Sequence, residues 1–382
     1  MELSALKVAG LYAGIGGFEL AFRQAGAVPV FLADSWDPAQ RVLKSKFPEA
    51  ELAGDVAEID ELPNGIDVVT AGFPCQNLSM AGDKTGITGK KSGDVRHLFD
   101  LIEISKPGVI LIENVYFMLH LDRGAAMEHL ISEFERLGYR WAYRLIDTLA
   151  FGLPQRRRRI YFVASKDIDP RDVLFRDTGE EHKVAAPTIE RPIGFYWTEG
   201  RSGAGLTADG VPPIKGGSGI GIPSAPAVLF PDGQVLMPDI ESCEALQGFP
   251  RKWTEAAAED KRSKRWVLVG NAVSVPAAGW VAKRIVNSST SFEPTGRANV
   301  LGSKWPNAAC GDRHGRYSVE ASASPLINAA PSISEYRTPA WTPLSLRALT
   351  GFVKRAREGN LRYPAGFLDS LDAAIVEAAQ RA

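Results

Sequence analysis

Residues 6–20, "LKVAGLYAGIGGFEL", run from an apolar segment through closely spaced glycines into a helical pattern. The segment Leu6–Tyr12 predicts a buried strand, and the residues after the glycines predict a helix. Gly14, Gly16 and Gly17 allow a tight turn and a close approach of the backbone to a ligand. Their spacing differs from Gly-x-Gly-x-x-Gly, so a nucleoside cofactor without a pyrophosphate fits better. The alternative is a tight turn that binds nothing.

Four further apolar segments predict strands, and helical patterns separate several of them. These segments are residues 28–33, 66–71, 109–112 and 160–164. Strands that alternate with helices favour a doubly wound, mostly parallel sheet with its functional loops at the carboxyl ends of the strands. Asp34 follows the second strand, where a carboxylate can meet ribose hydroxyls, and Trp36 can stack on an adenine.

The composition is that of an ordinary globular protein, with 45% hydrophobic and 23% charged residues among 382. The net charge of −1 shows no basic excess, and two local basic runs, residues 155–160 and 261–266, are either solvated or bind nucleic acid. No apolar run is long enough to predict a transmembrane helix, and the first residues do not resemble a secretory signal. Three scattered cysteines favour a reducing compartment. We therefore expect a cytoplasmic protein without membrane association.

Chemically distinctive residues follow or end three of the predicted strands. Cys75, in "GFPCQN", lies just past a strand end and is a candidate nucleophile, although an isolated cysteine is more often a small apolar filler. Glu113 ends an apolar strand, where a carboxyl is either partnered or functional. In "PQRRRRI", strand alternation would place Arg157 and Arg159 on one face and Arg156 and Arg158 on the other.

The chain divides into four predicted segments. Residues 1–165 form the first part of the core, and the Gly- and Pro-rich residues 166–236 form a smaller irregular domain that includes a hairpin around Asp232-Gly233. Residues 237–286 return to the core, and within them 265–286 predict a strand or turn followed by a helix that has Pro276 in its first turn. Residues 287–382 form a helical C-terminal extension, either a packing cap or an added DNA contact.

Six motifs in order carry a family resemblance: "AGIGGF", "GFPCQNLS", "IENV", "PQRRRR", "LQGFP" and "GNAVSVP". The chain resembles DNA cytosine-C5 methyltransferases over about residues 6–285, which implies a Rossmann-like methyltransferase sheet with a target-recognition domain at 166–236. The resemblance implies that Cys75 attacks C6 of a flipped cytosine, after which C5 takes the methyl group. It implies that Glu113 contacts N3, Arg159 supports O2, and Arg157 braces the catalytic loop and phosphates.

The resemblance also implies the cofactor S-adenosyl-L-methionine, released as S-adenosyl-L-homocysteine, and no metal. The implied cofactor residues are Phe18, Gly14, Gly16, Gly17, Asp34, Trp36, Asp55, Val56, Pro74, Asn271 and Ser274. The implied DNA-contacting residues are Gln76, Ser79, Gln155, Arg156 and Arg158, and residues 77–93 would close over the flipped base. Two positions depart from the family pattern. Ser35 occupies the usual place of the ribose-binding carboxylate, so we expect Asp34 to substitute, and either Glu241 or Glu244 fills the acidic position before "QGFP".

We expect double-stranded DNA as the partner of a monomer that serves a restriction-modification or defence system, with a possible cognate restriction endonuclease. Three alternatives remain open at this point. An RNA methyltransferase of the same fold would differ in substrate preference. A non-catalytic DNA-binding relative would not need Cys75. A nicotinamide-dependent oxidoreductase would not explain the Pro-Cys-Gln motif.

Overall fold

A computed structural model describes residues 5–73, 93–177, 179–181, 184–201, 203–217, 226–258, 262–288, 298–301 and 304–380. The chain folds into two compact units, each built from segments that are distant in the sequence. The larger unit comprises residues 1–150, 158–181 and 273–327, and the smaller unit comprises residues 151–157, 182–272 and 328–382.

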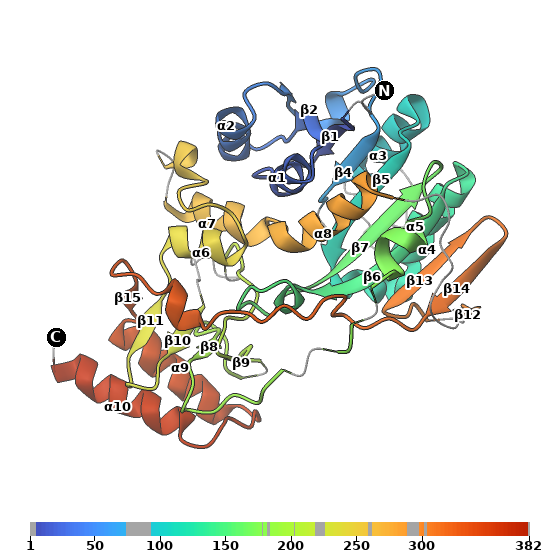
Figure 1. The fold of residues 1–382 in the computed structure, drawn as a ribbon. Helices are drawn as coiled ribbons and strands as arrows, with labels where there is room; N and C mark the ends of the chain where they lie inside the picture. Colours follow the sequence, from blue (N-terminus) through green and yellow to red (C-terminus); the bar gives the residue numbers. More distant parts are fainter. Residues whose placement is uncertain are drawn as a thin grey trace. The chain divides into compact units, whose positions relative to one another are not determined.

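The larger unit is built on a ten-stranded sheet (Figure 1). Its elements are β1 (Lys7–Leu11), α1 (Gly17–Gln24), β2 (Val28–Ala33), α2 (Asp37–Lys46), β3 (Glu51–Ala53), η1 (Val56–Glu58), β4 (Val68–Ala71), α3 (Gly93–Ser105), β5 (Val109–Val115), η4 (Tyr116–Leu119), η5 (Leu121–Gly124), α4 (Ala125–Arg136), β6 (Arg140–Asp147), η6 (Thr148–Ala150), β7 (Arg158–Ser165), α5 (Pro170–Phe175), α8 (Val275–Val286), β12 (Ala298–Val300), β13 (Ala308–Asp312) and β14 (Gly315–Val319).

The order of the strands in this sheet is β12-β14-β13-β6-β7-β5-β4-β1-β2-β3. The five strands from β3 to β5 pair in parallel, and β7 lies antiparallel between β5 and β6. The order reverses between β1 and β4, and a ligand of a doubly wound sheet binds at such a reversal, beyond the carboxyl ends of the strands. The predicted parallel sheet is therefore confirmed.

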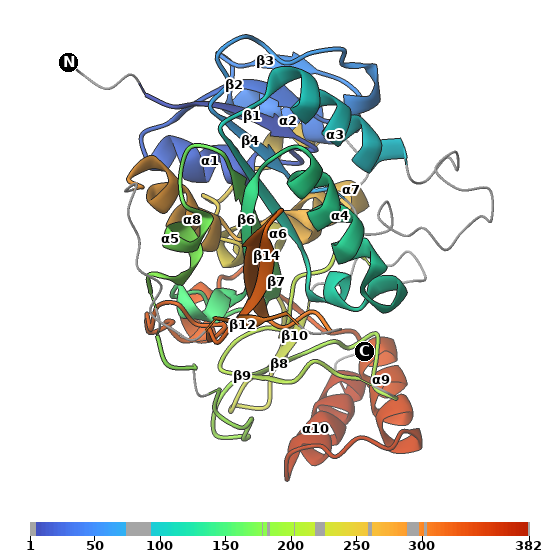
Figure 2. The ribbon, with the colours of Figure 1, turned by 90° about the vertical axis from the view of Figure 1, so that its right-hand side faces the viewer.

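Helices cover both faces of this sheet. Helices α3 and α4 lie on one face, where their apolar residues share a core with alternate residues of β1, β4, β5 and β7. Helices α1, α8 and α5 lie on the other face (Figure 2). Successive strand residues point to opposite faces, so Gly10, Thr70 and Glu113 belong to the α1 and α8 face.

The smaller unit contains a five-stranded antiparallel sheet with the order β15-β11-β10-β8-β9. Its elements are β8 (Ile193–Phe195), β9 (Thr207–Ala208), β10 (Ala227–Leu229), β11 (Val235–Met237), α6 (Ile240–Leu246), η7 (Glu255–Ala257), α7 (Arg262–Asn271), η8 (Ile333–Tyr336), β15 (Thr342–Pro343), α9 (Leu346–Glu358) and α10 (Phe367–Gln380). Ala227 and Leu229 of β10 pack with α9 and α10, whereas Val228 and Phe230 pack with α6 and α7. The unit is thus a sheet between two helical layers.

Three expectations about this organisation need correction. The boundaries at 166, 237 and 287 differ from those of the units, because 166–181 packs in the larger unit and 237–272 in the smaller one. The extension is not wholly helical, since 298–319 adds three strands to the large sheet beside β6. The segment 266–270 is part of helix α7 rather than a strand or turn. The hairpin of β10 and β11 and the helices α9 and α10 are as predicted.

Candidate cofactor and catalytic site

The glycine turn after β1 uses its glycines for two different reasons. Gly16 has φ 78°, and a Cβ there would lie 2.3 Å from the Phe47 ring, so both the backbone and the packing of α2 require glycine. Gly14 has φ 59°, and a Cβ there would meet no described atom within 4 Å. The turn is therefore held tightly at Gly16 and is open beside Gly14, as a turn that approaches a ligand should be.

Asp34 ties the loop after β2 to this turn. One carboxylate oxygen accepts the Gly14 N–H at 2.8 Å, and the other accepts the Trp36 N–H at 2.9 Å. Burial raises the pKa of Asp34 above its usual value, while these two N–H groups favour the charged form. Ser35, at the place where the family resemblance expects a carboxylate, is exposed. Asp34 has a fixed orientation at the edge of the turn.

The other predicted cofactor residues of the larger unit follow β1, β2 and β3. Phe18 is buried in the first turn of α1, and Trp36 is the partly exposed residue before α2. Asp55 caps η1 by accepting the Ala57 N–H at 3.0 Å, and the Val56 side chain is buried in the core. Because these strands are parallel neighbours, their carboxyl ends place the residues along one edge of the sheet.

Glu19, which the sequence analysis did not single out, lies directly behind the glycine turn. Its carboxyl is 1% exposed, and one oxygen accepts the Thr70 hydroxyl at 2.8 Å. The other oxygen has no hydrogen-bond partner among the described residues. Gly10 leaves room for this carboxyl, since a Cβ there would lie 2.2 Å from it. Burial raises the pKa of Glu19 to about 7.

Glu113 and Arg159 meet on the adjacent antiparallel strands β5 and β7. The Arg159 Nε lies 3.1 Å from a Glu113 oxygen, and both side chains are largely buried. Arg159 also donates to the carbonyl of Arg158 at 2.9 Å. The structure therefore brings these two predicted catalytic residues together as an ion pair.

Asn114 fastens the chain that leads into the cysteine loop. Its side-chain amide donates to the Phe73 carbonyl at 3.1 Å, and its oxygen accepts the Val115 N–H at 2.8 Å. Phe73 is the residue before Pro74, so β5 holds the start of this loop. Asn114 was missed by the sequence analysis, although its place beside Glu113 in "IENV" was the available signal. Pro74, Cys75, Gln76 and Ser79 lie outside the described residues.

The arginine run does not behave as one alternating strand, because β7 begins only at Arg158. Arg158 lies over the Tyr116 ring at 5.2 Å, and Arg156 is exposed. Arg157 is 2% exposed and donates to three main-chain carbonyls of the smaller unit, at Ile214, Gly270 and Ala272. The Arg157 guanidinium is buried, so its predicted phosphate contact is wrong. It braces main-chain segments of the smaller unit, whereas the catalytic loop that it is predicted to brace lies outside the described residues.

Gln155 is also wrongly predicted to contact DNA. Its side chain is fully buried in the smaller unit. Its amide donates to the Leu246 carbonyl at 2.8 Å and to the Gln247 side chain at 3.0 Å, and its oxygen accepts the Ile214 N–H at 3.0 Å. Gln155 and Arg157 thus connect segments that are far apart in the sequence.

The structure separates the two candidate acids before "QGFP". Glu244 is fully buried and accepts the backbone N–H groups of Trp253 and Thr254 at 3.0 and 2.9 Å. It also pairs with Arg265 at 3.1 Å. Glu241 lies in the first turn of α6 and is partly exposed. Glu244 is therefore the structural anchor of this motif.

The last motif, "GNAVSVP", spans the point where the chain passes from one unit to the other. Asn271 ends α7 in the smaller unit and is exposed. Ser274 precedes α8 in the larger unit, is 1% exposed, and its hydroxyl has no hydrogen-bond partner among the described residues. A buried hydroxyl without a protein partner is available to a ligand.

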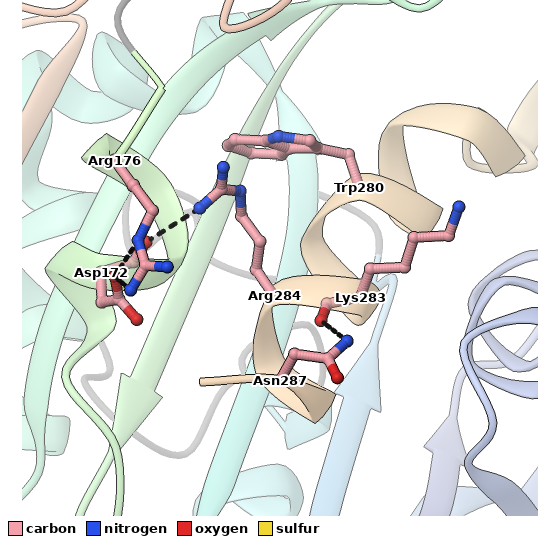
Figure 3. A pocket seen from close by; sticks show the side chains of 6 residues that line it. All are labelled: Asp172, Arg176, Trp280, Lys283, Arg284 and Asn287. Atoms are coloured by element: carbon pink, nitrogen blue, oxygen red, sulfur yellow. Dashed lines mark hydrogen bonds and ion pairs between the residues drawn. The ribbon is translucent and has the colours of Figure 1, made fainter. Parts of the chain in front are cut away.

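A separate hollow of about 320 Å³ lies between α5 and α8 and is lined by residues of an ion-pair network (Figure 3). Arg176, the residue after α5, pairs with Asp172 of that helix. Arg284 donates to the Asp172 carbonyl and pairs with Asp177. Figure 3 shows the Lys283 amine pointing away from this network. Neighbouring carboxylates neutralise both arginines of the hollow. Neither arginine therefore offers an unpaired positive charge to a ligand.

Comparisons with known proteins identify the family of this chain. The family profile described as C-5 cytosine-specific DNA methylase matches residues 6–191. The type II methyltransferase M2.BsuMI of Bacillus subtilis (strain 168) is 42% identical over 381 residues, which cover 96% of this chain and 97% of that protein. M.HhaI of Haemophilus parahaemolyticus is 25% identical, with 77% of this chain and 98% of that protein covered.

The solved structure of the S. pombe Dnmt2 methyltransferase superposes with a TM-score of 0.54 at 17% identity, over 74% of this chain and 98% of that chain. At that identity the likeness concerns the fold alone. In the part of the chain that the structure describes, no helix is long and apolar enough to cross a membrane.

Proposed function

Because the chain belongs to the C-5 cytosine-specific DNA methylase family, we propose that Cys75 attacks C6 of a cytosine flipped out of duplex DNA so that C5 receives the methyl group. The protein is a DNA cytosine-C5 methyltransferase of the restriction-modification type. Its methyl donor is S-adenosylmethionine, as predicted for this family.

The observation that carries the proposal is the position of the Glu113–Arg159 pair beside the start of the Cys75 loop. Asn114, the neighbour of Glu113, binds the carbonyl of Phe73, two residues before Cys75. Thiolate addition forms an S–C6 bond and moves electron density toward N3 and O2 of the ring. Glu113 protonates or hydrogen-bonds N3, and Arg159 stabilises the charge at O2.

The rest of the reaction restores the ring. C5 of the adduct takes the methyl group as the sulfonium S–CH₃ bond breaks, which leaves S-adenosylhomocysteine. A base then removes the C5 proton, and the electron pair of that bond reforms the C5–C6 double bond as the Cys75 thiolate leaves. Cys75 is therefore regenerated at the end of the reaction.

The residues along the carboxyl edge of the large sheet fit the methyl donor. S-adenosylmethionine supplies an electrophilic methyl group on a sulfonium. Phe18 and the turn of Gly14, Gly16 and Gly17 hold the methionine side, and the open space at Gly14 supports this assignment. The remaining cofactor contacts in the proposal come from Asp34, Trp36, Asp55, Val56, Pro74, Asn271 and Ser274.

Within the proposal, Asp34 is the ribose partner and Asp55 meets the adenine amino group. The two N–H bonds that orient the Asp34 carboxylate leave lone pairs on both oxygens for hydroxyl donors. The buried Ser274 hydroxyl supports a contact at the methionine end. Gln76, Ser79, Arg156 and Arg158 remain the proposed DNA contacts.

The smaller unit is proposed to recognise the target sequence. Its sheet and loops lie outside the methyltransferase sheet, and sequence readout requires side chains on base edges backed by phosphate contacts. We further propose that the protein acts as a monomer in the cytoplasm and protects host DNA from a cognate restriction endonuclease.

Bisulfite sequencing of host DNA tests this proposal. Host strains would express the wild type, Cys75→Ser, or Cys310→Ser as a matched control at a buried cysteine of β13. Protected cytosines at one recurring sequence are expected with the wild type and Cys310→Ser, and none with Cys75→Ser. Protection by Cys75→Ser at the wild-type level would exclude the covalent mechanism.

A duplex with 5-fluorocytosine at the recurring position gives a second readout. Since fluorine cannot leave as a proton does, the S–C6 adduct should persist through denaturing electrophoresis. The adduct is expected with the wild type and not with Cys75→Ser. Turnover without any adduct would exclude the covalent mechanism in the same way.

A further inference from the structure

The C-terminal helices complete the hydrophobic core of the smaller unit. Leu349, Phe352 and Val353 of α9 and Phe367 of α10 are buried in one core with Phe195 of β8. The Phe195 ring centroid lies 4.9 Å from that of Phe352 and 5.4 Å from that of Phe367. Strand β15 also pairs with β11. Residues 328–380 are therefore an integral part of this unit rather than an attached tail.

Helix α9 also orients the loop that follows β8. The Arg355 guanidinium donates to the carbonyls of Glu199 and Trp197 at 2.9 and 2.7 Å. These bonds hold the loop against α9. Trp197 and Thr198 line a hollow of about 420 Å³ whose other lining residues, all in or just before α9, include Ser345, Arg347 and Arg355. The hollow offers an aromatic ring, hydroxyl groups and two arginines from segments about 150 residues apart, and Arg355 is already bonded to the loop carbonyls.

Arg347 is the exposed cation of this hollow. No carboxylate among the described residues pairs with the Arg347 guanidinium, so its positive charge is not neutralised there. It lies in the first turn of α9, where a positive charge opposes the helix dipole. Local helix stability therefore does not explain an arginine at this position, but attraction of an anion does.

The charge of the whole unit points to the same kind of ligand. The smaller unit contains more Lys and Arg than Asp and Glu, whereas the larger unit contains fewer. The overall charge of −1 conceals this asymmetry. A basic excess in one unit of a protein with almost no net charge fits a nucleic-acid ligand, because phosphates supply much of the affinity of nucleic-acid binding.

We propose that the DNA-recognition unit of this enzyme is bipartite, and that its C-terminal part binds a DNA backbone phosphate through Arg347, assisted by the Thr198 hydroxyl. The proposal rests on the proposed function, because it takes duplex DNA as the substrate. It assigns residues 328–380 to target binding, which the sequence analysis left open between a packing cap and a DNA contact.

The test measures the affinity of the full-length protein for a DNA duplex that contains the enzyme's target sequence, over a series of NaCl concentrations. Arg347→Ala should weaken binding roughly 5- to 10-fold and reduce the slope of log K against log salt by about 1, as expected for one lost phosphate contact. Arg347→Lys should keep the wild-type slope. Thr198→Val should weaken binding without changing the slope, because it removes a neutral hydrogen bond.

Arg362→Ala is the charge-matched control, at an exposed arginine between α9 and α10. It should leave both the affinity and the slope unchanged. A wild-type affinity and slope for Arg347→Ala, or an equal loss for Arg362→Ala, would overturn the proposal. Wild-type protein that binds S-adenosylmethionine but does not methylate the duplex would overturn the proposed function itself, and the recognition role with it.

Discussion

Asn114 shows how one side chain can link two segments of the proposed catalytic site. It donates to the carbonyl of Phe73 and accepts the N–H of Val115, so one amide fixes the end of β5 and the start of the cysteine loop. The preceding residue, Glu113, is held in turn by Arg159. A reaction that needs a sulfur atom and a carboxyl on one small ring depends on such fixed distances.

Replacing Asn114 with aspartate tests this positioning role. Asn114→Asp keeps the acceptor for the Val115 N–H but removes the donor to Phe73, so the cysteine loop loses its anchor. We expect kcat to fall roughly 10- to 100-fold, while the Kd for S-adenosylmethionine stays close to that of the wild type. Isothermal titration gives the Kd and tritium transfer gives kcat. An equal loss of cofactor affinity would assign Asn114 to general folding instead.

Glu19 gives the protein a specific dependence of stability on pH. Its pKa is about 7 in the folded protein, against 4.5 for an ordinary glutamate. The folded state therefore keeps the proton while the unfolded state loses it, so the stability contributed by Glu19 falls from about pH 4.5 to pH 7 and is constant above that. The total loss is of order 3 kcal/mol.

Glu19→Gln should remove this dependence. The neutral amide keeps an oxygen for the Thr70 hydroxyl, so the variant should gain stability over the wild type as pH rises from 4.5 to 7. Urea unfolding at pH 4.5, 6 and 8 measures this difference. A difference that is the same at all three pH values would show that ionisation of Glu19 is not its cause.

At the scale of elements, the fully buried Arg144 of β6 joins the β13–β14 extension to the large sheet. It donates to the carbonyls of Leu174 and Asp177 at 2.7 Å and of Ser322 at 2.9 Å. Burial lowers the pKa of Arg144 to about 10, which leaves it charged at neutral pH. These bonds connect β6, the end of α5 and the chain after β14.

Arg144→Met should therefore destabilise the larger unit, because it leaves three carbonyls without a donor. We expect the free energy of unfolding to fall by about 3 kcal/mol or more. Arg140→Met on the same strand is the control, since Arg140 is exposed and makes one backbone contact at 3.1 Å. Urea unfolding compares the two variants. Equal losses would mean that position on β6, rather than the buried network, causes the effect.

Helix α7 shows why one apolar run was assigned wrongly. The residues Trp266–Gly270 are mostly apolar and bulky, which favours a strand or a turn when read alone. Trp266 and Val269, three residues apart, enter the same core in the smaller unit, as a helical spacing allows. A short apolar run is too short to show a helical or strand periodicity. Whether it forms a helix or a strand therefore depends on the core that it packs against.

At the scale of the whole molecule, the two units have separate cores, so damage to one should leave the other folded. Phe352 is fully buried in the smaller unit, and Phe352→Ala should cost that unit about 3–5 kcal/mol. We expect DNA binding to be lost while S-adenosylmethionine binding is largely kept. Calorimetry should show two unfolding transitions. The cofactor should raise the midpoint of the larger unit's transition, and Phe352→Ala should lower only the midpoint of the smaller unit's transition. A single transition that moves as a whole would show that the units unfold together.

The parallel strands and the glycine turn were predictable from sequence because their signals are local. An apolar run, a cluster of glycines and a following helical pattern lie within about 20 neighbouring residues. The ion-paired residues Glu113 and Arg159, which are proposed to be catalytic, could be singled out for the same reason, since each lies in a distinctive motif. Gln155 and Arg157 were misplaced because arginine and glutamine read as surface residues until their distant carbonyl partners are known.

The sequence by itself therefore determined the methyltransferase family, the doubly wound sheet and the set of motifs at its carboxyl edge, because these depend on short-range patterns and residue chemistry. Only the tertiary structure decided how the segments are distributed between the two units. It placed 328–380 in the core of the smaller unit and 298–319 on the edge of the large sheet. Apolar side chains indicate that a segment will be buried, but the surface that buries them is supplied by residues far away in the chain.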